Sequence, residues 1–332
     1  MHQDELDSAI EEYTRAIALD PQDAEAHGNR GLAYYDKGDY ERAIADLTRA
    51  IALDPTDCEA YSYRGNAYKE QGELDRAIAD LTQAVALDPE YAEAYSDRGI
   101  AYYLEDALDQ AIADCDRAIA LDPGLVEAYN NRGSAYYDRG DPGRAIADYD
   151  RVIALDPEDA DAYYNRGNAY HEMGDLDQAI ADFDRAIALD PELARAYNNR
   201  GLVYCDKGDL DRAIADYDRA IALDPESAGA YYNRGNAYFS LGDLDRAIAD
   251  YDQAIAVDPQ DAEAYFNRGN AYYLMGDLDQ AIADYDRAIA LDPHDADAHY
   301  NRANAYEDKG DLDDAIADYG QAVALDPQDA DD

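Results

Sequence analysis

Proline recurs along this sequence at a constant interval of 34 residues, nearly always within the tripeptide Leu-Asp-Pro. A fixed period of this length indicates a tandem array in which one small supersecondary unit is copied many times. Each unit of such an array packs only against its neighbours, so the chain does not need one central core. The prolines are Pro21, Pro55, Pro89, Pro123, Pro157, Pro191, Pro225, Pro259, Pro293 and Pro327.

Placing each proline at position 32 of a unit divides the chain into three parts. Residues 24–329 form nine full repeats, residues 1–23 supply only the second helix of a truncated repeat, and residues 330–332 form an acidic tail. The full repeats begin at Ala24, Cys58, Ala92, Val126, Ala160, Ala194, Ala228, Ala262 and Ala296.

Each unit carries the signals of two helices. The first is expected over positions 1–14, as in 160–173, and Gly174 suits the left-handed residue that ends it. An aspartate then begins the second helix as its N-cap, and the Asp-Pro pair ends that helix, because the residue before proline is disfavoured in the α region. The predicted caps are Asp39, Asp141, Asp175, Asp209, Asp243, Asp277 and Asp311.

Each helix also has one apolar stripe. Tyr163 and Tyr170 lie seven residues apart on a first helix, and Ile180, Phe183 and Ile187 follow the i, i+3, i+7 spacing on the second. Small residues such as Gly167, Ala179 and Ala186 should allow the two helix axes to approach closely.

This pattern of aromatic, Gly, Tyr, Ala, Phe, Ala and Pro resembles that of the tetratricopeptide repeat family, in its bacterial-type Asn-Arg-Gly variety. The unit that contains Tyr163, Gly167, Tyr170, Ala179, Phe183, Ala186 and Pro191 matches the family at every position except one. The resemblance implies an all-α fold, a right-handed superhelical α-solenoid of tandem 34-residue helix-turn-helix repeats.

The exception is an arginine where the family has leucine. It stands in all nine full repeats, at Arg30, Arg64, Arg98, Arg132, Arg166, Arg200, Arg234, Arg268 and Arg302. An arginine near a packing surface needs an acidic partner. For Arg166 the candidates are Asp182 in the same repeat and Asp156 of the preceding Leu-Asp-Pro. We interpret these arginines as structural rather than as ligand contacts.

The charge balance excludes some classes of partner. The chain has 76 acidic and 27 basic residues, a formal net charge of −49 and a pI near 4.1. The bases are scattered among acids, whereas nucleic-acid binding requires clustered Lys and Arg. We therefore expect no nucleic-acid partner. The acidity is either inherited with a copied Asp-rich unit or is an adaptation to high salt.

Three cysteines, Cys58, Cys115 and Cys205, occupy three different repeat positions, which favours reduced thiols over disulfides. Polar and acidic residues follow Met1 at once, and no apolar run reaches the roughly 20 residues that cross a membrane. We therefore expect a cytoplasmic protein without a membrane partner.

In the family that this chain resembles, positions 2, 5, 6, 9, 12 and 13 of the first helices line a concave groove that binds extended peptides or helices. Here the groove would carry asparagines that hold a peptide backbone, together with aromatic rings that either anchor a ligand or pack sideways. The predicted peptide-binding residues are Asn131, Asn165, Asn168, Asn199, Asn233, Asn236, Asn267, Asn270, Asn301, Tyr137, Tyr164, Tyr232, Phe239, Phe266, Tyr273 and Tyr300; Asn304 extends the row.

The same six positions carry fifteen acids and two bases, Lys69 and Arg195, over the nine repeats. A field of this sign favours a basic segment as the partner. Family members that clamp a C-terminal carboxylate use lysine prominently, so we do not expect that activity.

No catalytic or metal site is expected. The five histidines have no metal-ligand spacing, and no phosphate loop or nucleophile motif occurs. The sequence therefore predicts a non-catalytic scaffold, with no cofactor, that binds an extended basic peptide. Two alternatives stay open, a structural subunit that assembles end to end and the repeat arm of a larger multidomain protein.

Overall fold

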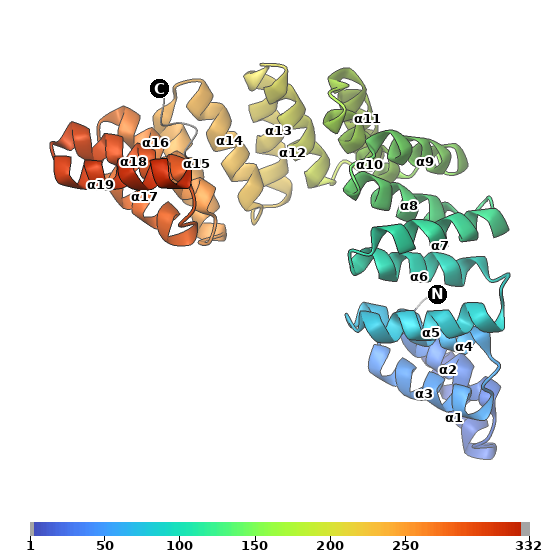
Figure 1. Ribbon diagram of the computed structural model, residues 1–332. Helices are drawn as coiled ribbons and strands as arrows, with labels where there is room; N and C mark the ends of the chain where they lie inside the picture. Colours follow the sequence, from blue (N-terminus) through green and yellow to red (C-terminus); the bar gives the residue numbers. More distant parts are fainter. Residues whose placement is uncertain (1–2, 327–332) are drawn as a thin grey trace. The chain divides into compact units, whose positions relative to one another are not determined.

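The computed structural model describes residues 3–326, and these residues form nineteen α-helices and no β-strand (Figure 1). This confirms the all-α class. The chain divides into two compact units, Met1–Gly174 with α1–α10 (unit 1) and Asp175–Asp332 with α11–α19 (unit 2), and each is described by itself. The predicted acidic tail, 330–332, lies outside the described residues.

First and second helices of the repeats alternate along the chain. The first helices are α2 (Ala24–Asp36), α4 (Cys58–Glu70), α6 (Ala92–Leu104), α8 (Val126–Asp138), α10 (Ala160–Glu172), α12 (Ala194–Asp206), α14 (Ala228–Ser240), α16 (Ala262–Met275) and α18 (Ala296–Lys309). The second helices are α1 (Gln3–Leu19), α3 (Tyr40–Leu53), α5 (Leu74–Leu87), α7 (Leu108–Leu121), α9 (Pro142–Leu155), α11 (Leu176–Leu189), α13 (Leu210–Leu223), α15 (Leu244–Val257), α17 (Leu278–Leu291) and α19 (Leu312–Leu325).

The predicted N-caps of the second helices are correct in five of seven cases. Asp39, Asp141, Asp209, Asp243 and Asp277 accept a hydrogen bond from the backbone N–H three residues later. Asp175 and Asp311 make no such bond, so for these two the prediction is wrong. Where an arginine follows three residues after the cap, it also binds the cap carboxylate, as Arg246 does with Asp243. The side chain at this place does not by itself decide the outcome, because Asp277 makes its cap bond with Gln280 there, whereas Asp175 with Gln178 does not.

The turn between the two helices of a repeat requires a left-handed residue. Gly174 has φ +77°, as glycine readily allows. In one repeat Asp106 takes this place with φ 60°, the one positive φ outside glycine among the described residues. Aspartate tolerates this region better than most residues but at some cost.

The core of each unit is built from close contacts between small and large side chains. In unit 2, the rings of Phe183, Tyr217, Tyr251 and Tyr285 on the second helices are almost completely buried. A Cβ added to Gly235 would lie 2.8 Å from Cε1 of Tyr251, so glycine is required at this crossing. The predicted apolar stripe on the first helices is more exposed to solvent than expected, because Tyr163 and Tyr170 are only half-buried. The Arg166 guanidinium lies 5.5 Å and 5.8 Å from the centroids of these two rings.

Contacts between neighbouring repeats define an inner side for each unit. In unit 1, α2, α4, α6, α8 and α10 touch one another in order, and in unit 2 the same holds for α12, α14, α16 and α18. Within the described part of each unit, second helices make no comparable contact with one another. The first helices therefore form the tighter, inner row. None of the helices between residues 3 and 326 has the length and apolar character needed to cross a membrane.

Candidate functional site

The inner surface of each unit comprises the side chains at positions 2, 5, 6, 9, 12 and 13 of its first helices. The predicted binding residues lie on α8 and α10 in unit 1 and on α12, α14, α16 and α18 in unit 2. All of them are half-buried except Tyr300, which is 52% exposed. Each is therefore within reach of solvent.

The asparagines of unit 2 are hydrogen-bonded to one another across repeats. Asn270 Oδ1 accepts the hydroxyl of Tyr285 at 2.8 Å and the Nδ2 group of Asn301 at 3.0 Å. Asn236 Oδ1 likewise accepts the hydroxyl of Tyr251 at 2.7 Å and Asn267 Nδ2 at 3.3 Å. Both lone pairs of each carbonyl oxygen are thereby used, so these two asparagines can offer a ligand only N–H groups.

Aromatic rings at position 5 pack against the second helix of their own repeat. The ring centroids of Tyr232 and Tyr251 are 6.1 Å apart, and those of Phe266 and Tyr285 are 6.0 Å apart, both tilted. These distances are typical of stabilising aromatic pairs. The rings at position 5 thus pack within their own repeat, an arrangement that differs from both alternatives left open by the sequence, a ligand anchor and sideways packing between first helices.

Tyrosine hydroxyls hold the acids of the inner surface in place. Tyr273 donates to Asp308 at 2.7 Å and Tyr103 donates to Asp138, in each case one repeat further along. The hydrogen bond to Asp308, together with burial, raises the pKa of Tyr273; burial and then the bond to Asp138 raise that of Tyr103. Both phenols therefore remain donors at neutral pH.

Among the cavities on the inner surface, one in unit 1 and one in unit 2 are lined by equivalent repeat positions. The cavity of unit 2 has a volume of about 220 Å³ and is lined by Phe239, Asn270, Tyr273, Leu274, Tyr285, Asn301 and Asn304. The cavity of unit 1 has about 180 Å³ and is lined by Tyr103, Ser134, Tyr137, Asp138, Tyr149, Asn165 and Asn168. Sequence reasoning missed Tyr149 and Tyr285, because their position on the second helix had been assigned to the core.

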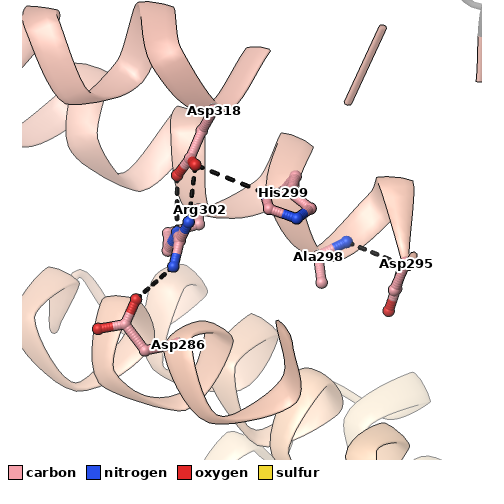
Figure 2. Close-up of polar contacts among 6 residues, drawn as sticks. All are labelled: Asp286, Asp295, Ala298, His299, Arg302 and Asp318. Atoms are coloured by element: carbon pink, nitrogen blue, oxygen red, sulfur yellow. Dashed lines mark hydrogen bonds and ion pairs between the residues drawn. The ribbon is translucent and has the colours of Figure 1, made fainter. Parts of the chain in front are cut away.

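The repeated arginines are paired with carboxylates, as their structural interpretation requires. A carboxylate on the second helix of the same repeat accepts hydrogen bonds from Nε and Nη2 at 2.6–2.8 Å, a bidentate geometry. The pairs are Arg30–Asp46, Arg64–Asp80, Arg98–Asp114, Arg132–Asp148, Arg200–Asp216, Arg234–Asp250, Arg268–Asp284 and Arg302–Asp318. Figure 2 shows the last pair, with His299 beside the same carboxylate.

The second partner of these arginines differs from the prediction. Asp156 of the Leu-Asp-Pro turn instead accepts the backbone N–H of Glu158 at 3.0 Å, and Arg166 donates to Asp150 on α9. The Leu-Asp-Pro carboxylates cap their own turns, because the N–H two residues later is nearer. The residue 16 places before each arginine accepts a hydrogen bond from Nη1. This residue is a threonine in three repeats and an aspartate in six: Thr14, Thr48, Thr82, Asp116, Asp150, Asp184, Asp218, Asp252 and Asp286.

In the repeats where the second partner is an aspartate, two carboxylates keep the guanidinium charged. Burial opposes the charge of Arg302, but hydrogen bonds to Asp318 and Asp286 overcome it and raise its pKa (Figure 2). The side chain of Arg302 is only 17% exposed, so little of the guanidinium is available to a ligand. Among residues 3–326, no group of three or more His, Cys, Asp or Glu side chains could hold a metal ion.

An array of helix pairs with an inner row of first helices is the architecture of a repeat-scaffold protein. Sequence models of protein families match most of the chain. The model described as TPR repeat matches residues 1–38, 31–72, 65–106, 133–174, 201–242, 235–276 and 269–310, and models described as tetratricopeptide repeat match 92–125, 160–193, 296–329 and 183–215. The chain belongs to the tetratricopeptide repeat family.

Two solved structures with TM-scores of 0.60 and 0.62 share the fold, and a third is similar in sequence over half of this chain. The APC/C hetero-tetramer Cut9-Hcn1 is 20% identical over 92% of this chain and 60% of that one, with a TM-score of 0.62. A tetratricopeptide repeat protein from Parabacteroides merdae is 20% identical over 75% of this chain and 98% of that one, with a TM-score of 0.60. MamA is 32% identical over 49% of this chain and 96% of that one, with a TM-score of 0.47. Among curated proteins, none matches the sequence.

Proposed function

We propose that this chain is a non-catalytic cytoplasmic scaffold whose inner surface binds an extended, basic segment of another protein. The observation that carries the proposal is the charge of the inner surface, where fifteen acids face two bases. Since phenols fix some of these acids in place, their charge is directed rather than averaged over many rotamers. A field of this kind accelerates the approach of a cationic partner and selects against anionic ones.

The inner surface also has groups suited to an extended backbone. Asn270 Nδ2 donates one N–H to Asn267 Oδ1 at 3.5 Å. Among the described residues its other N–H has no acceptor, so it is available to a ligand carbonyl. Peptide carbonyls of an extended chain face alternately to either side, so that spaced amide donors can hold them without regard to side chains. The negative charge would then select basic peptides, and the asparagines would fix the register of the bound backbone.

The test is to pan a random peptide library against the full chain at low and at molar salt. We expect Lys- and Arg-rich peptides that are lost at molar salt, because exposed charges are then screened. A matched pair of variants locates the site. Glu263→Gln with Asp308→Asn removes two inner acids, and Asp211→Asn with Asp245→Asn removes two exposed acids from second helices. The first pair should weaken binding and its salt dependence, and the second should not; equal effects would contradict an inner site.

Assembly end to end is a second candidate. On α19, Leu312, Ile316 and Val323 are 58%, 70% and 46% exposed, which is unusual for large apolar side chains on one helix. A cavity of about 350 Å³ beside them is lined in part by Tyr300 and Tyr319. If this face joins copies, light scattering will show mass rising with concentration and Ile316→Lys will abolish the rise. A constant monomer mass removes this candidate.

A further inference from the structure

The cavities of units 1 and 2 occupy the same seven repeat positions, four repeats apart. Four of the seven positions carry identical residues: Tyr137 and Tyr273, Tyr149 and Tyr285, Asn165 and Asn301, Asn168 and Asn304. The backbone that frames each cavity is the same helix-turn-helix unit. Any difference in what the cavities accept must therefore come from the other three positions.

Two of these differences form one coherent exchange. In unit 1, Tyr103 donates its hydroxyl to Asp138, and both line the cavity. In unit 2 the same places hold Phe239, which lacks the hydroxyl, and Leu274, which lacks the carboxylate. A hydrogen-bonded polar pair has thus become an apolar pair. The third difference, Ser134 against Asn270, changes the hydrogen-bond partner of the tyrosine on the second helix. The Tyr149 hydroxyl lies 3.3 Å from Ser134 Oγ, whereas the Tyr285 hydroxyl donates to Asn270 Oδ1 at 2.8 Å.

Most polar groups that line the cavity of unit 2 are already hydrogen-bonded, and Asn270 keeps only one N–H for a guest. The Tyr285 hydroxyl and Asn301 Nδ2 both point to Asn270 Oδ1, at 2.8 and 3.0 Å, and the Tyr273 hydroxyl is engaged by Asp308. Leu274 stands beside the opening and is 61% exposed, which costs free energy unless something covers it. A cavity of about 150 Å³ is enough to hold a benzene ring, so 220 Å³ accommodates a leucine or methionine side chain.

The cavity of unit 1 suits a cation. The exposed carboxylate of Asp138 is fixed by Tyr103, and the rings of Tyr103 and Tyr137 provide π faces beside it. A carboxylate together with aromatic faces is the combination that binds an ammonium or guanidinium group. Burial and then the neighbouring carboxylate of Glu172 raise the pKa of Tyr137, so Glu172 adds a second negative charge close to this cavity.

We propose that the two cavities are side-chain subsites of different specificity: the unit 1 cavity takes lysine or arginine, and the unit 2 cavity takes leucine or methionine. This rests on the proposed function, since it assumes that the inner surface holds a peptide segment. It goes beyond that function in requiring a partner with both basic and aliphatic residues. A uniformly basic partner would leave the unit 2 subsite empty.

The experiment uses the full chain and two short synthetic peptides with flanking glycines and lysines. One carries a diazirine analogue of leucine at its centre, and the other a diazirine analogue of lysine. Binding is followed by fluorescence anisotropy, and the crosslinked residues are identified by mass spectrometry. We expect the leucine analogue to crosslink around Phe239 and Leu274, and the lysine analogue around Tyr103 and Asp138.

Reciprocal exchanges provide matched variants. Phe239→Tyr with Leu274→Asp gives unit 2 the residues of unit 1, and Tyr103→Phe with Asp138→Leu does the reverse. Each pair already exists at that position in the chain, so folding should be preserved, and circular dichroism checks this. The unit 2 exchange should lower crosslinking of the leucine analogue there by about tenfold, consistent with loss of one buried aliphatic contact, and the unit 1 exchange should create a new site for it.

The outcomes separate the two proposals. If neither peptide binds saturably to the unaltered chain, the proposed function fails, and the subsites with it. If both bind but the leucine analogue reacts equally in both cavities, or the exchanges leave its distribution unchanged, only the subsite proposal is overturned. The crosslinking pattern of the unaltered chain gives this answer even if an exchanged variant fails to fold.

Discussion

Replacing Arg234 by methionine should loosen α14 and α15 strongly, whereas replacing Asp218 by threonine should barely affect them. Arg234 donates from Nε and Nη2 to Asp250 at 2.8 and 2.6 Å, and those two side chains are 19% and 7% exposed. Asp218, which receives the third contact, is 55% exposed. Methionine preserves the aliphatic stem and therefore isolates the loss of charge.

The difference in exposure sets the magnitudes. Removing one partner of a buried ion pair leaves an uncompensated charge and costs about 3–5 kcal/mol. An exposed pair contributes at most about 1 kcal/mol, and the threonines in this place in the first repeats show that a hydroxyl suffices. At roughly 1.4 kcal/mol per factor of ten, Arg234→Met should lower hydrogen-exchange protection in α14 and α15 by about two to three and a half decades.

Hydrogen exchange measured by mass spectrometry is the appropriate assay, because a repeat array need not unfold in one step. The double variant serves as the control for coupling through the shared guanidinium. Unchanged protection in Arg234→Met would refute the structural role of the arginine row. Equal losses in Arg234→Met and Asp218→Thr would refute the ranking by exposure.

Single positions give three further expectations. Gly235→Ala should destabilise by about 1–2 kcal/mol, because its Cβ would press on a buried tyrosine ring, whereas Gly229→Ala in the same helix meets open space and should stabilise by about 0.5–1 kcal/mol; urea unfolding compares them. Asp106→Gly should raise stability by about 1 kcal/mol in the same assay, since it relieves a positive φ, and no gain would refute strain at this turn. The Arg246 guanidinium, and its backbone N–H, lower the pKa of Asp243, so the stability from this cap is present above about pH 4 and is lost as pH falls through the lowered value; Arg246→Ala should raise that pKa in a carbon-13 NMR titration, and an unchanged pKa would contradict it.

The helices were predictable because their start and stop signals are local. Proline, glycine and aspartate act within a few residues, so one period of the sequence describes every copy. The missing cap bond at Asp175 was not predictable from local sequence, because the same residues follow Asp277, which does make the bond.

The site was less predictable, since its contacts cross repeats. Asn270 was recognised as an inner residue, but nothing local shows that its oxygen is shared by Tyr285 and Asn301. The same holds for the pair of Tyr103 and Asp138, which are one residue more than a full repeat apart. Such contacts depend on how one repeat is rotated against the next. That rotation results from the packing of many side chains between repeats, so no local sequence motif predicts it.

The position of each acid bears on why the chain is so acidic. Many aspartates have a structural partner that recurs with the repeat: a helix N-terminus for Asp243, a turn for Asp156, a guanidinium for Asp250. Copying one unit multiplies these acids without any selection for charge. Of the inner acids, those at position 2 recur in the first turn of most first helices, whereas position 13 varies, since the place of Asp138 holds leucine at Leu274. A residue that the fold does not require, and that varies between copies of one unit, can be selected for ligand binding. The variable positions of the inner surface are therefore where selectivity between ligands should be sought.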